Sequence, residues 1–328
     1  YLCRYGEIFL KGLNRNQFED ALVRNIKLMA EQHGLKLVVT KIHNRLLIEN
    51  EMKELPFLAK VFGLVSYSPA KKATLDWEEL KKTAVNFMQE LEFRTFKVNA
   101  QRQNKKFPLT SPEINRELGK HLEARTKKEV DLHQPEIELG VEIEEDCIYL
   151  FTEKIPCAGG LPVGCEGRVA LFVEDGDSLK AGILMMKRGC AIHPFSFEKK
   201  DISALQEYSP FPLELKIVKN IKEIEIWAEK EKVGVLVVGQ LMENFKELKT
   251  EMVVFRPLIG DLEELKKKII FGSYLKTGTL SDEEWKFCES IDWHPVDELP
   301  LKEGFIKKIE QRKKEKFIKF KSIDDLFR

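Results

Sequence analysis

The segment of this chain that most limits its fold is a buried strand, a tight loop and a helix within residues 159–189, GGLPVGCEGRVALFVEDGDSLKAGILMMKRG. The apolar run 169–173 is typical of a parallel strand, and the periodic apolar residues of 179–186 predict the helix that follows. A loop at such a junction points backbone N–H groups at a ligand and normally favours an anion. Here the loop 174–177 carries three carboxylates, which repel a phosphate unless a divalent cation bridges them.

Strand and helix signals alternate along the rest of the chain, so we predict a multidomain protein of mixed α/β and α+β class. The 328 residues exceed one usual domain, and three compositional blocks predict domains at 1–60, 61–164 and 165–328. In the third block, apolar strands that alternate with helices favour an open, doubly wound parallel sheet. Its predicted strands are 169–173, 213–218, 233–238 and 252–255.

The first two blocks each mix strands with amphipathic helices. The first block fits a ferredoxin-like sandwich. Its predicted strands are 2–10, 35–39 and 46–48, and its predicted helices are 16–32 and 55–61. In the second block the predicted helices are 77–91 and 113–127, and the predicted strands are 95–100, 136–143 and 147–152. Ser111 is a suitable N-cap for the helix 113–127, with Pro112 at the first helical position.

Charge and cysteine content restrict the classes of function. Lys plus Arg equals Asp plus Glu at 54 each, so attraction to nucleic acid must come from local patches. The six cysteines show no metal-ligand or redox spacing, which favours a reduced, cytoplasmic location and no metal site. No apolar run reaches membrane-spanning length and no leader opens the chain, so no membrane association is predicted. The chain begins at Tyr1, within a predicted strand and without a methionine, which indicates missing residues before it.

A basic patch lies in the second block. Between Arg94 and Lys128, ten basic residues stand against three acidic ones. Six or seven neutralised phosphates would give substantial, salt-sensitive affinity for nucleic acid, because counterions are released. The polar loop 101–107, QRQNKKF, precedes a helix whose first N–H groups add donors for a phosphate. A solvated helix face is the alternative interpretation of the same charges.

Several motifs in one order resemble the tRNA 4-thiouridine synthetase (tRNA sulfurtransferase) family. They are RYGEIFLKGLNRNQFEDALVRNIK at 4–27, VFGLVSYSPA at 61–70, FKVNAQRQNKKFPLTSPEINRELGKHL at 96–122, VDLHQPEIELGVEI at 130–143, GGLPVG at 159–164, MKRG at 186–189 and RPLIG at 256–260. The match in the first 164 residues is specific, because several long motifs occur in one order. The match beyond is partial.

This resemblance implies a ferredoxin-like domain and a THUMP domain that together bind the acceptor end of tRNA, and the basic patch lies inside the THUMP match. Lys and Arg side chains would set the position of the RNA through its phosphates. Phe107 would stack on a base, or alternatively pack in the core at a strand–loop junction. The RNA contacts that the resemblance implies are Lys11, Asn14, Arg15, Arg102, Asn104, Lys105, Lys106, Phe107, Pro108 and Arg116.

The third domain resembles a PP-loop ATP pyrophosphatase, whose signature SGGxDS binds ATP so that a target uridine can be adenylated. The corresponding positions 173–178 read VEDGDS, so only Asp177 and Ser178 are retained. The loss of two glycines blocks close approach of the backbone to phosphate, and the added carboxylates repel it. The segment after Gly239 is shortened, and Leu262 stands where the family has a lysine. The pattern therefore predicts a degenerate nucleotide site.

Two functions follow as hypotheses. The first is a tRNA-binding protein with impaired ATP-dependent adenylation and no required cofactor. The alternative is an active tRNA sulfurtransferase that makes 4-thiouridine with ATP and Mg²⁺. It would use Asp177 and Ser178 to bind the nucleotide, and Asp177 and Cys288 as catalytic residues. Packing within a helix is the other interpretation of Cys288, because the neighbouring glutamates disfavour a thiolate. A sulfur donor, such as a cysteine desulfurase, would be a separate partner, and the resemblance also makes a homodimer an expectation.

Overall fold

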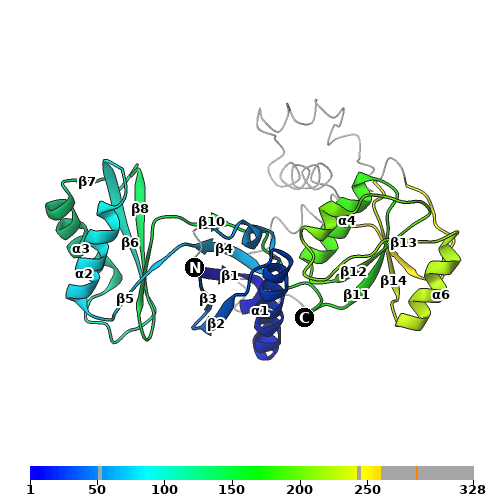
Figure 1. Cartoon of the computed structure of the whole chain (residues 1–328), viewed down its shortest axis with the longest axis horizontal. Helices are drawn as coiled ribbons and strands as arrows, with labels where there is room; N and C mark the ends of the chain where they lie inside the picture. The colour runs from blue at the N-terminus through cyan, green and yellow to red at the C-terminus, as the bar shows by residue number, and fades with distance from the viewer. Residues whose placement is uncertain (51–53, 242–244, 260–285, 287–328) are drawn as a thin grey trace, which may run out of the picture. The chain divides into compact units, whose positions relative to one another are not determined.

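Three five-stranded sheets, each with its own helices, make up most of the part of the chain that the structure describes (Figure 1). The computed structural model describes residues 1–50, 54–241, 245–259 and 286. Residues 1–259 form one unit, within which we call the three sheets and their helices the first, second and third domains; residues 260–328 fall in another unit. Among the described residues, no helix is both long and apolar enough to span a bilayer.

The first domain is an antiparallel sheet in the order β10-β4-β1-β3-β2, and helix α1 packs against this sheet. Its strands are β1 (Leu2–Tyr5), β2 (Val38–Ile42), β3 (Arg45–Glu49), β4 (Leu64–Ser68) and β10 (Ile155–Pro156), and its helices are α1 (Arg15–Gln32) and the 3-10 helices η1 (Glu7–Asn14) and η2 (Pro56–Lys60). Leu22, Ile26 and Met29 recur at helical spacing in α1 and share one core with Leu46 and Ile48 of β3. The predicted helix 16–32 is therefore confirmed.

Two predictions for the first domain are wrong in detail. The predicted strand 2–10 ends at Tyr5 and continues as η1, because a short apolar run alone does not separate a strand from a helical turn. The first sheet also extends past the predicted boundary at residue 60. Both β4, which pairs with β1, and β10, which pairs with β4, belong to it.

The second domain is a mixed sheet in the order β5-β9-β8-β6-β7, with helices α2 and α3 packed on it (Figure 1). Its strands are β5 (Lys71–Ala73), β6 (Thr95–Arg102), β7 (Glu129–Val130), β8 (Ile137–Ile143) and β9 (Ile148–Phe151), and its helices are α2 (Trp77–Gln89) and α3 (Ser111–Thr126). The N-cap of α3 is Thr110 and not the predicted Ser111. The backbone N–H and the hydroxyl of Thr110 both donate to the Glu113 carboxylate, at 2.8 and 2.7 Å.

The third domain confirms the predicted parallel sheet, in the order β13-β12-β11-β14-β15. Its strands are β11 (Arg168–Phe172), β12 (Ala191–Ser196), β13 (Lys216–Ile217), β14 (Val235–Val238) and β15 (Val253–Phe255), and its helices are α4 (Gly176–Lys187), α5 (Ser203–Gln206) and α6 (Ile221–Glu231). Val169 and Leu171 of β11 pack in one core with residues of α4, while Ala170 and Phe172 pack in another with residues of α6. Both faces of the sheet are thus covered.

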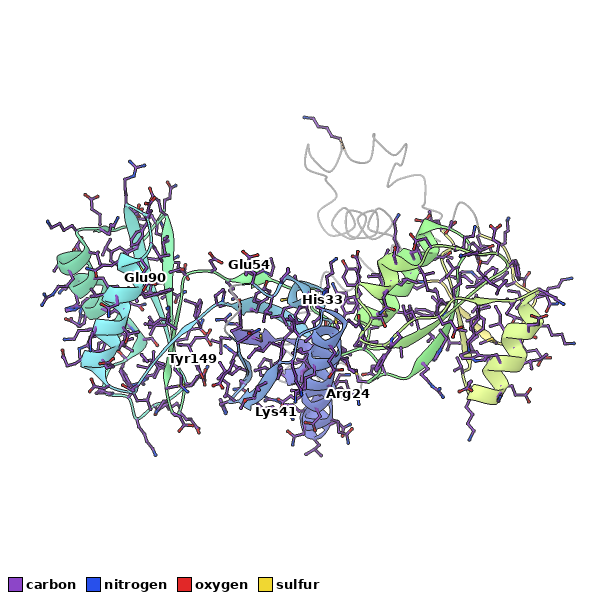
Figure 2. All side chains as sticks on the ribbon, in the orientation of Figure 1. Arg24, His33, Lys41, Glu54, Glu90 and Tyr149 are labelled. Carbon is purple, nitrogen blue, oxygen red and sulfur yellow. The ribbon has the colours of Figure 1, made fainter. Side chains whose placement is uncertain are left out.

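Buried charges connect the first and second domains. The Glu142 carboxylate accepts from Arg4 Nε at 2.8 Å and from Arg45 Nε at 3.0 Å, and Arg4 Nη1 donates to Ser68 Oγ at 2.9 Å. Elsewhere, charged side chains such as those of Arg24 and Glu90 are exposed on or beside the helices (Figure 2). Because a buried carboxylate is costly without partners, the two arginines make the burial of Glu142 tolerable.

Glu144, two residues along from Glu142, is buried without such partners. Its side chain is 4% exposed, and neither carboxylate oxygen has a hydrogen-bond partner among the described residues. Burial raises the pKa of Glu144, and the nearby Glu142 charge raises it further, against smaller opposing effects of Arg45 and His43. The folded state therefore holds a proton on Glu144 more tightly than the unfolded chain does.

This difference predicts that Glu144→Gln stabilises the protein at neutral pH, by about 1–3 kcal/mol. Above the ordinary pKa range of a glutamate, the unfolded chain ionises freely while the folded chain must bury the charge, so stability falls as the pH rises. The advantage of the glutamine should shrink as the pH is lowered toward 4. Thermal unfolding between pH 4 and 8 measures it, with the exposed neighbour Glu145→Gln as the control. An equal effect of both variants would contradict the assignment.

Candidate nucleic-acid interface and phosphate loop

The loop between β6 and α3 is held by two of the residues that were predicted to contact RNA. Arg102 Nη1 donates to the carbonyls of Phe107 and Leu109 at 3.1 and 3.2 Å. Asn104 Oδ1 accepts from the backbone N–H of Lys106 at 2.9 Å, and its Nδ2 donates to the Glu145 carbonyl at 3.2 Å. These bonds satisfy loop backbone groups that would otherwise lack partners, so Arg102 and Asn104 fix the shape of the loop.

Lys105 and Lys106 lie on this loop with exposed side chains. Within the described part of the chain, neither ammonium group is in an ion pair. Arg116, on the first turns of α3, is also exposed, and among the described residues its ion-pair partner is its neighbour Glu117 at 2.9 Å. Such an exposed pair contributes little, so an anion can replace Glu117 at small cost. Three cations at this end of the second domain are therefore available to phosphates.

Phe107 does not take part in this surface. Its ring is 4% exposed and lies in the core of the second domain with Ile114 and Leu118 of α3. Stacking on a base would require the ring to leave that core and lose the free energy of its burial. The alternative interpretation, a core aromatic residue at a strand–loop junction, therefore describes the ring in this structure, and contact of Phe107 with RNA stays a prediction.

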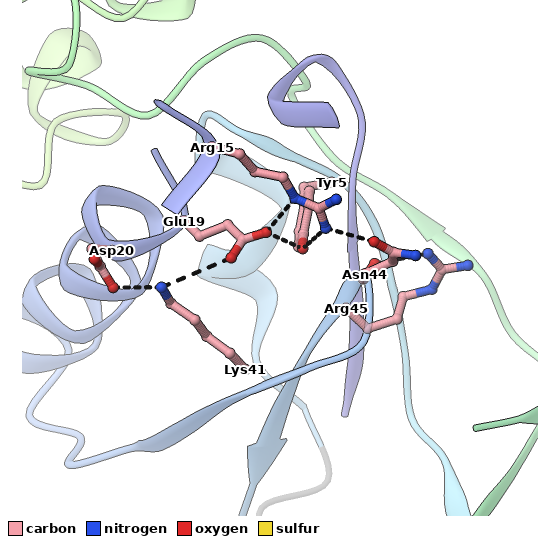
Figure 3. Close-up of polar contacts among 7 residues, drawn as sticks. All are labelled: Tyr5, Arg15, Glu19, Asp20, Lys41, Asn44 and Arg45. Carbon is pink, nitrogen blue, oxygen red and sulfur yellow. Dashed lines mark hydrogen bonds and ion pairs between the residues drawn. The ribbon is translucent and has the colours of Figure 1, made fainter. Parts of the chain in front are cut away.

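In the first domain, Arg15 lies at the centre of a polar cluster at the start of α1 (Figure 3). Its Nε donates to Glu19 Oε1 at 2.7 Å, and its Nη2 donates to Asn44 Oδ1 at 2.6 Å and to the Tyr5 hydroxyl at 3.1 Å. The Tyr5 hydroxyl donates in turn to Glu19, and burial together with this bond raises the pKa of Tyr5 to about 12. Arg15 thus holds β1, α1 and the β2–β3 turn together, and contact with RNA stays a prediction for it.

Lys11 and Asn14, the other predicted contacts of the first domain, differ in their surroundings. The Lys11 ammonium pairs with Glu166 Oε1 at 2.6 Å and lies 4.5 Å from the centre of the Phe18 ring. An RNA phosphate would therefore compete with Glu166 for Lys11. Asn14 is exposed at the end of η1, and its side chain does not cap α1.

Four basic groups that line a groove between α2 and α3 were only partly recognised from the sequence. The groove has a volume of about 290 Å³ and is lined by Glu78, Lys81, Lys82, Val85, Asn86, His121 and Arg125. Burial lowers the pKa of His121, and the charges of Lys81 and Arg125 lower it further, so these groups act on one another. Lys81 and Lys82 were missed because they precede the segment 94–128. Their spacing on a predicted helix was the available signal.

The turn after β11 uses its own side chains where an anion would otherwise bind. Asp175 Oδ1 accepts from the backbone N–H and from the hydroxyl of Ser178, at 2.9 and 3.1 Å. The Ser178 hydroxyl accepts in turn from the backbone N–H of Glu174 at 3.1 Å. Asp175 is therefore the N-cap of α4, and its carboxylate already lies against the positive end of the helix.

Asp177 and Gly239 also have close neighbours at this turn. Asp177 Oδ1 pairs with Lys180 one turn along α4, at 2.8 Å. Gly239, directly after β14, lies so close to this turn that a Cβ there would be 2.1 Å from the Ser178 nitrogen. The structure thus brings Asp177, Ser178 and Gly239 together. The backbone at Gly239 therefore lies directly beside the first residues of α4.

The cysteines and metal-ligand candidates offer little reactive chemistry in the described residues. Burial raises the pKa of the Cys165 thiol to about 12 and also raises the pKa of Cys190, which disfavours a thiolate at either position. Cys288 and Leu262, which entered the sequence argument, lie outside the described residues. Among the described side chains, no group of three or more His, Cys, Asp or Glu is placed to hold a metal ion.

Comparison with known proteins identifies both N-terminal domains. Residues 1–68 match the model of the ThiI ferredoxin-like domain, and residues 75–153 match the model of the THUMP domain. A probable tRNA sulfurtransferase of Moorella thermoacetica is 43% identical over 205 residues, which cover 60% of this chain and 52% of that protein. The protein of the same description from Methanocaldococcus jannaschii is 40% identical over 202 residues, or 58% and 53% of the two chains. The matched region spans about half the length of these curated relatives.

Solved structures extend the likeness into the third domain. The crystal structure of PH1313 from Pyrococcus horikoshii Ot3 has a TM-score of 0.73 and 28% identity, and the match covers 85% of this chain and 99% of that one. A 4-thiouridine synthetase–RNA complex with bound ATP has a TM-score of 0.67 and 27% identity, covering 95% and 93%. Together with the two domain models and the curated relatives, these matches show that the chain belongs to the tRNA 4-thiouridine synthetase (tRNA sulfurtransferase) family.

Proposed function

We propose that this chain binds tRNA, at its acceptor end, through the ferredoxin-like and THUMP domains. The observation that carries the proposal is that Lys105 and Lys106 are exposed and have no ion pair with any described residue. They lie within the THUMP match, on a loop shaped by Arg102 and Asn104. The solved relative that is a 4-thiouridine synthetase–RNA complex supports RNA as the ligand. The ammonium groups of the two lysines would lie against backbone phosphates and set the position of the RNA without reading its bases.

Charge favours this assignment over a generic solvated surface. Lys105, Lys106 and Arg116 follow one another from the end of β6 to the first turns of α3, and Arg116 has only the exposed neighbour Glu117 as partner. An RNA phosphate meets these side chains without breaking a buried ion pair. Lys11 and Arg15 differ, because each must give up a carboxylate before it can bind RNA. We therefore propose that most of the affinity for RNA comes from the loop between β6 and α3, which we call the THUMP loop. In the first domain, Asn14 is the accessible contact.

We also propose that the third domain has impaired ATP-dependent adenylation. ATP does not fit the residues present, because the Asp175 carboxylate already accepts from the Ser178 N–H, one of the helix N–H groups that would receive a phosphate. Glu174 and Asp177 add negative charge to the same turn, and Gly239 lies against its backbone. Repulsion between these carboxylates and a triphosphate would oppose binding further. The chain would then act as a tRNA-binding protein that assists or competes with a modification enzyme in the cytoplasm.

The second candidate function is an active tRNA sulfurtransferase that makes 4-thiouridine. The observation in its favour is the likeness, over 95% of this chain, to a 4-thiouridine synthetase solved with bound ATP. In this case Asp177 and Ser178 would have to turn toward the nucleotide and Mg²⁺, and Cys288 would serve as the thiol. A cysteine desulfurase or another donor would supply the sulfur. Self-association into a homodimer belongs to this proposal as well, and light scattering of the purified chain measures it.

Replacing Lys105 and Lys106 with alanine should weaken tRNA binding roughly tenfold at moderate salt, because two phosphate contacts are lost. The slope of log affinity against log salt concentration should fall by about 1.5 to 2. Filter binding or fluorescence anisotropy with one tRNA over a salt series measures both quantities. Neither lysine packs in a core, so the variant should fold as the parent does.

The matched control is the double variant Lys219→Ala and Lys222→Ala, which removes two exposed lysines from the third domain. It should leave the affinity and the salt slope within twofold of the parent. If both double variants reduce binding equally, the RNA contact is diffuse and the assigned loop is wrong.

Isothermal calorimetry with MgATP should give no binding at nucleotide concentrations up to about 1 mM, since the cap of α4 and the three carboxylates oppose a phosphate there. Binding of tRNA by the same preparation shows that the protein is folded. A micromolar dissociation constant for ATP, with AMP released on addition of tRNA, would establish the second candidate function and refute impaired adenylation. The tRNA-binding proposal would survive that result.

A further inference from the structure

A cavity in the third domain lies away from the turn 173–178. Its volume is about 410 Å³, and it opens where β11 and β12 begin, whereas the turn follows the other end of β11. Its apolar walls come from Ile192, Pro194, Phe211, Pro212 and Leu213, and its polar walls come from Arg168, His193, Ser209, Glu214 and Lys216. Volumes of this order are typical of sites for small molecules.

Lys216 supplies a positive charge without a carboxylate partner. Within the described residues no Asp or Glu oxygen pairs with its ammonium group, which instead lies 4.8 Å from the centre of the Trp227 ring and 5.7 Å from that of Phe195. The two rings hold the lysine in place, since a cation over an aromatic face is attracted to it. A half-buried ammonium group that lacks a counter-ion favours an anion beside it.

Arg168 adds a guanidinium group of fixed orientation. Its Nη1 donates to Glu231 Oε2 at 3.2 Å, and its Nη2 donates to the Glu231 carbonyl at 2.7 Å. Glu231 belongs to α6 and offsets part of this charge. Glu214 is the one carboxylate that lines the cavity, and its side chain is exposed. The described lining therefore carries two permanent cations against one solvated carboxylate.

His193 lies on β12 between these cations. Burial lowers the pKa of His193, and the charges of Lys216 and Arg168 lower it further, so the imidazole is neutral near pH 7. Its ring centre is 4.9 Å from that of Trp227. Its Nε2 is buried without a hydrogen-bond partner among the described residues. The histidine thus contributes a polar group, and no third charge.

We propose that this cavity binds a small organic anion. Its phosphate or carboxylate group would lie against Lys216 and Arg168, and its apolar or planar body would lie against Phe211 and Leu213. The combination of an apolar wall with a few convergent polar groups fixes the orientation of such a ligand. The site is separate from the turn 173–178 and from the RNA surface, so it stands whether or not the proposed function does.

Calorimetry of the full chain with UMP, AMP and benzoate tests the proposal. We expect at least one probe to bind with a dissociation constant below about 1 mM. Lys216→Met keeps the apolar stem over Trp227 and removes the charge, and it should weaken that binding at least tenfold. Lys219→Met, an exposed lysine three residues along and outside the cavity, should change it less than twofold. Binding of a nucleotide alone identifies a phosphate as the anion, and binding of benzoate alone identifies a carboxylate; either supports the site.

A local readout keeps the test decisive if Lys216→Met unfolds. In the unmodified chain labelled with ¹³C-histidine, the His193 resonance, assigned by its loss in His193→Gln, should shift on saturation with the probe. Failure of all three probes to bind at about 10 mM would overturn the proposal. So would binding that leaves the His193 resonance unmoved, or that Lys216→Met and Lys219→Met affect alike.

Discussion

The bond between the Asp175 carboxylate and the N–H of Ser178 caps helix α4 directly after strand β11. In this parallel sheet the strand order changes direction between β11 and β14, because β12 and β13 follow on one side and β15 lies on the other. In open parallel sheets, ligands generally bind at the carboxyl ends of the strands at such a point. The helix that starts at this point is the natural receptor for a phosphate. Here the Asp175 carboxylate accepts from the Ser178 N–H at that position, and the proposal of impaired adenylation rests on this bond.

The THUMP loop differs from the turn after β11, because its charged lysine side chains are exposed. Arg102 and Asn104 use their side chains on backbone groups of the loop and of the β8–β9 turn, whereas Lys105 and Lys106 form no ion pair within the described part of the chain. Arg102 and Asn104 thus shape the loop, and Lys105 and Lys106 provide its exposed positive charge. Because each such lysine is solvated before binding, affinity would come from release of counterions, and salt would control it.

How far the sequence predicts this structure depends on the length and period of each signal. The helices α1, α2 and α4 and the strand β11 were predicted well, because each has a long apolar period or a short buried run between turn residues. Strand β12 was missed, since His193 and Pro194 interrupt its apolar pattern. Sheet membership was also out of reach: β10 returns to the first sheet after the whole second domain, and no local pattern encodes such a pairing.

The same limit applies to the site residues. Charge and position were enough to place Lys105 and Lys106 on a polar, basic loop, but not to separate them from Arg102, whose partners are carbonyls. Arg15 has Glu19 at helical spacing, yet Tyr5 and Asn44 come to it only through the fold (Figure 3). A motif that resembles a family's binding residues therefore mixes contacts with the scaffold that positions them.

Gly239 has a consequence for any attempt to rebuild a nucleotide pocket in this domain. Its hydrogen faces the Ser178 amide across a space too small for a methyl group, so two backbones share one wall without an intervening side chain. Exchanging the acidic residues for glycine would remove the repulsion but leave that wall standing. Any side chain at position 239 would require one of the two backbones to move, so the main-chain path constrains such a redesign as well as the charge.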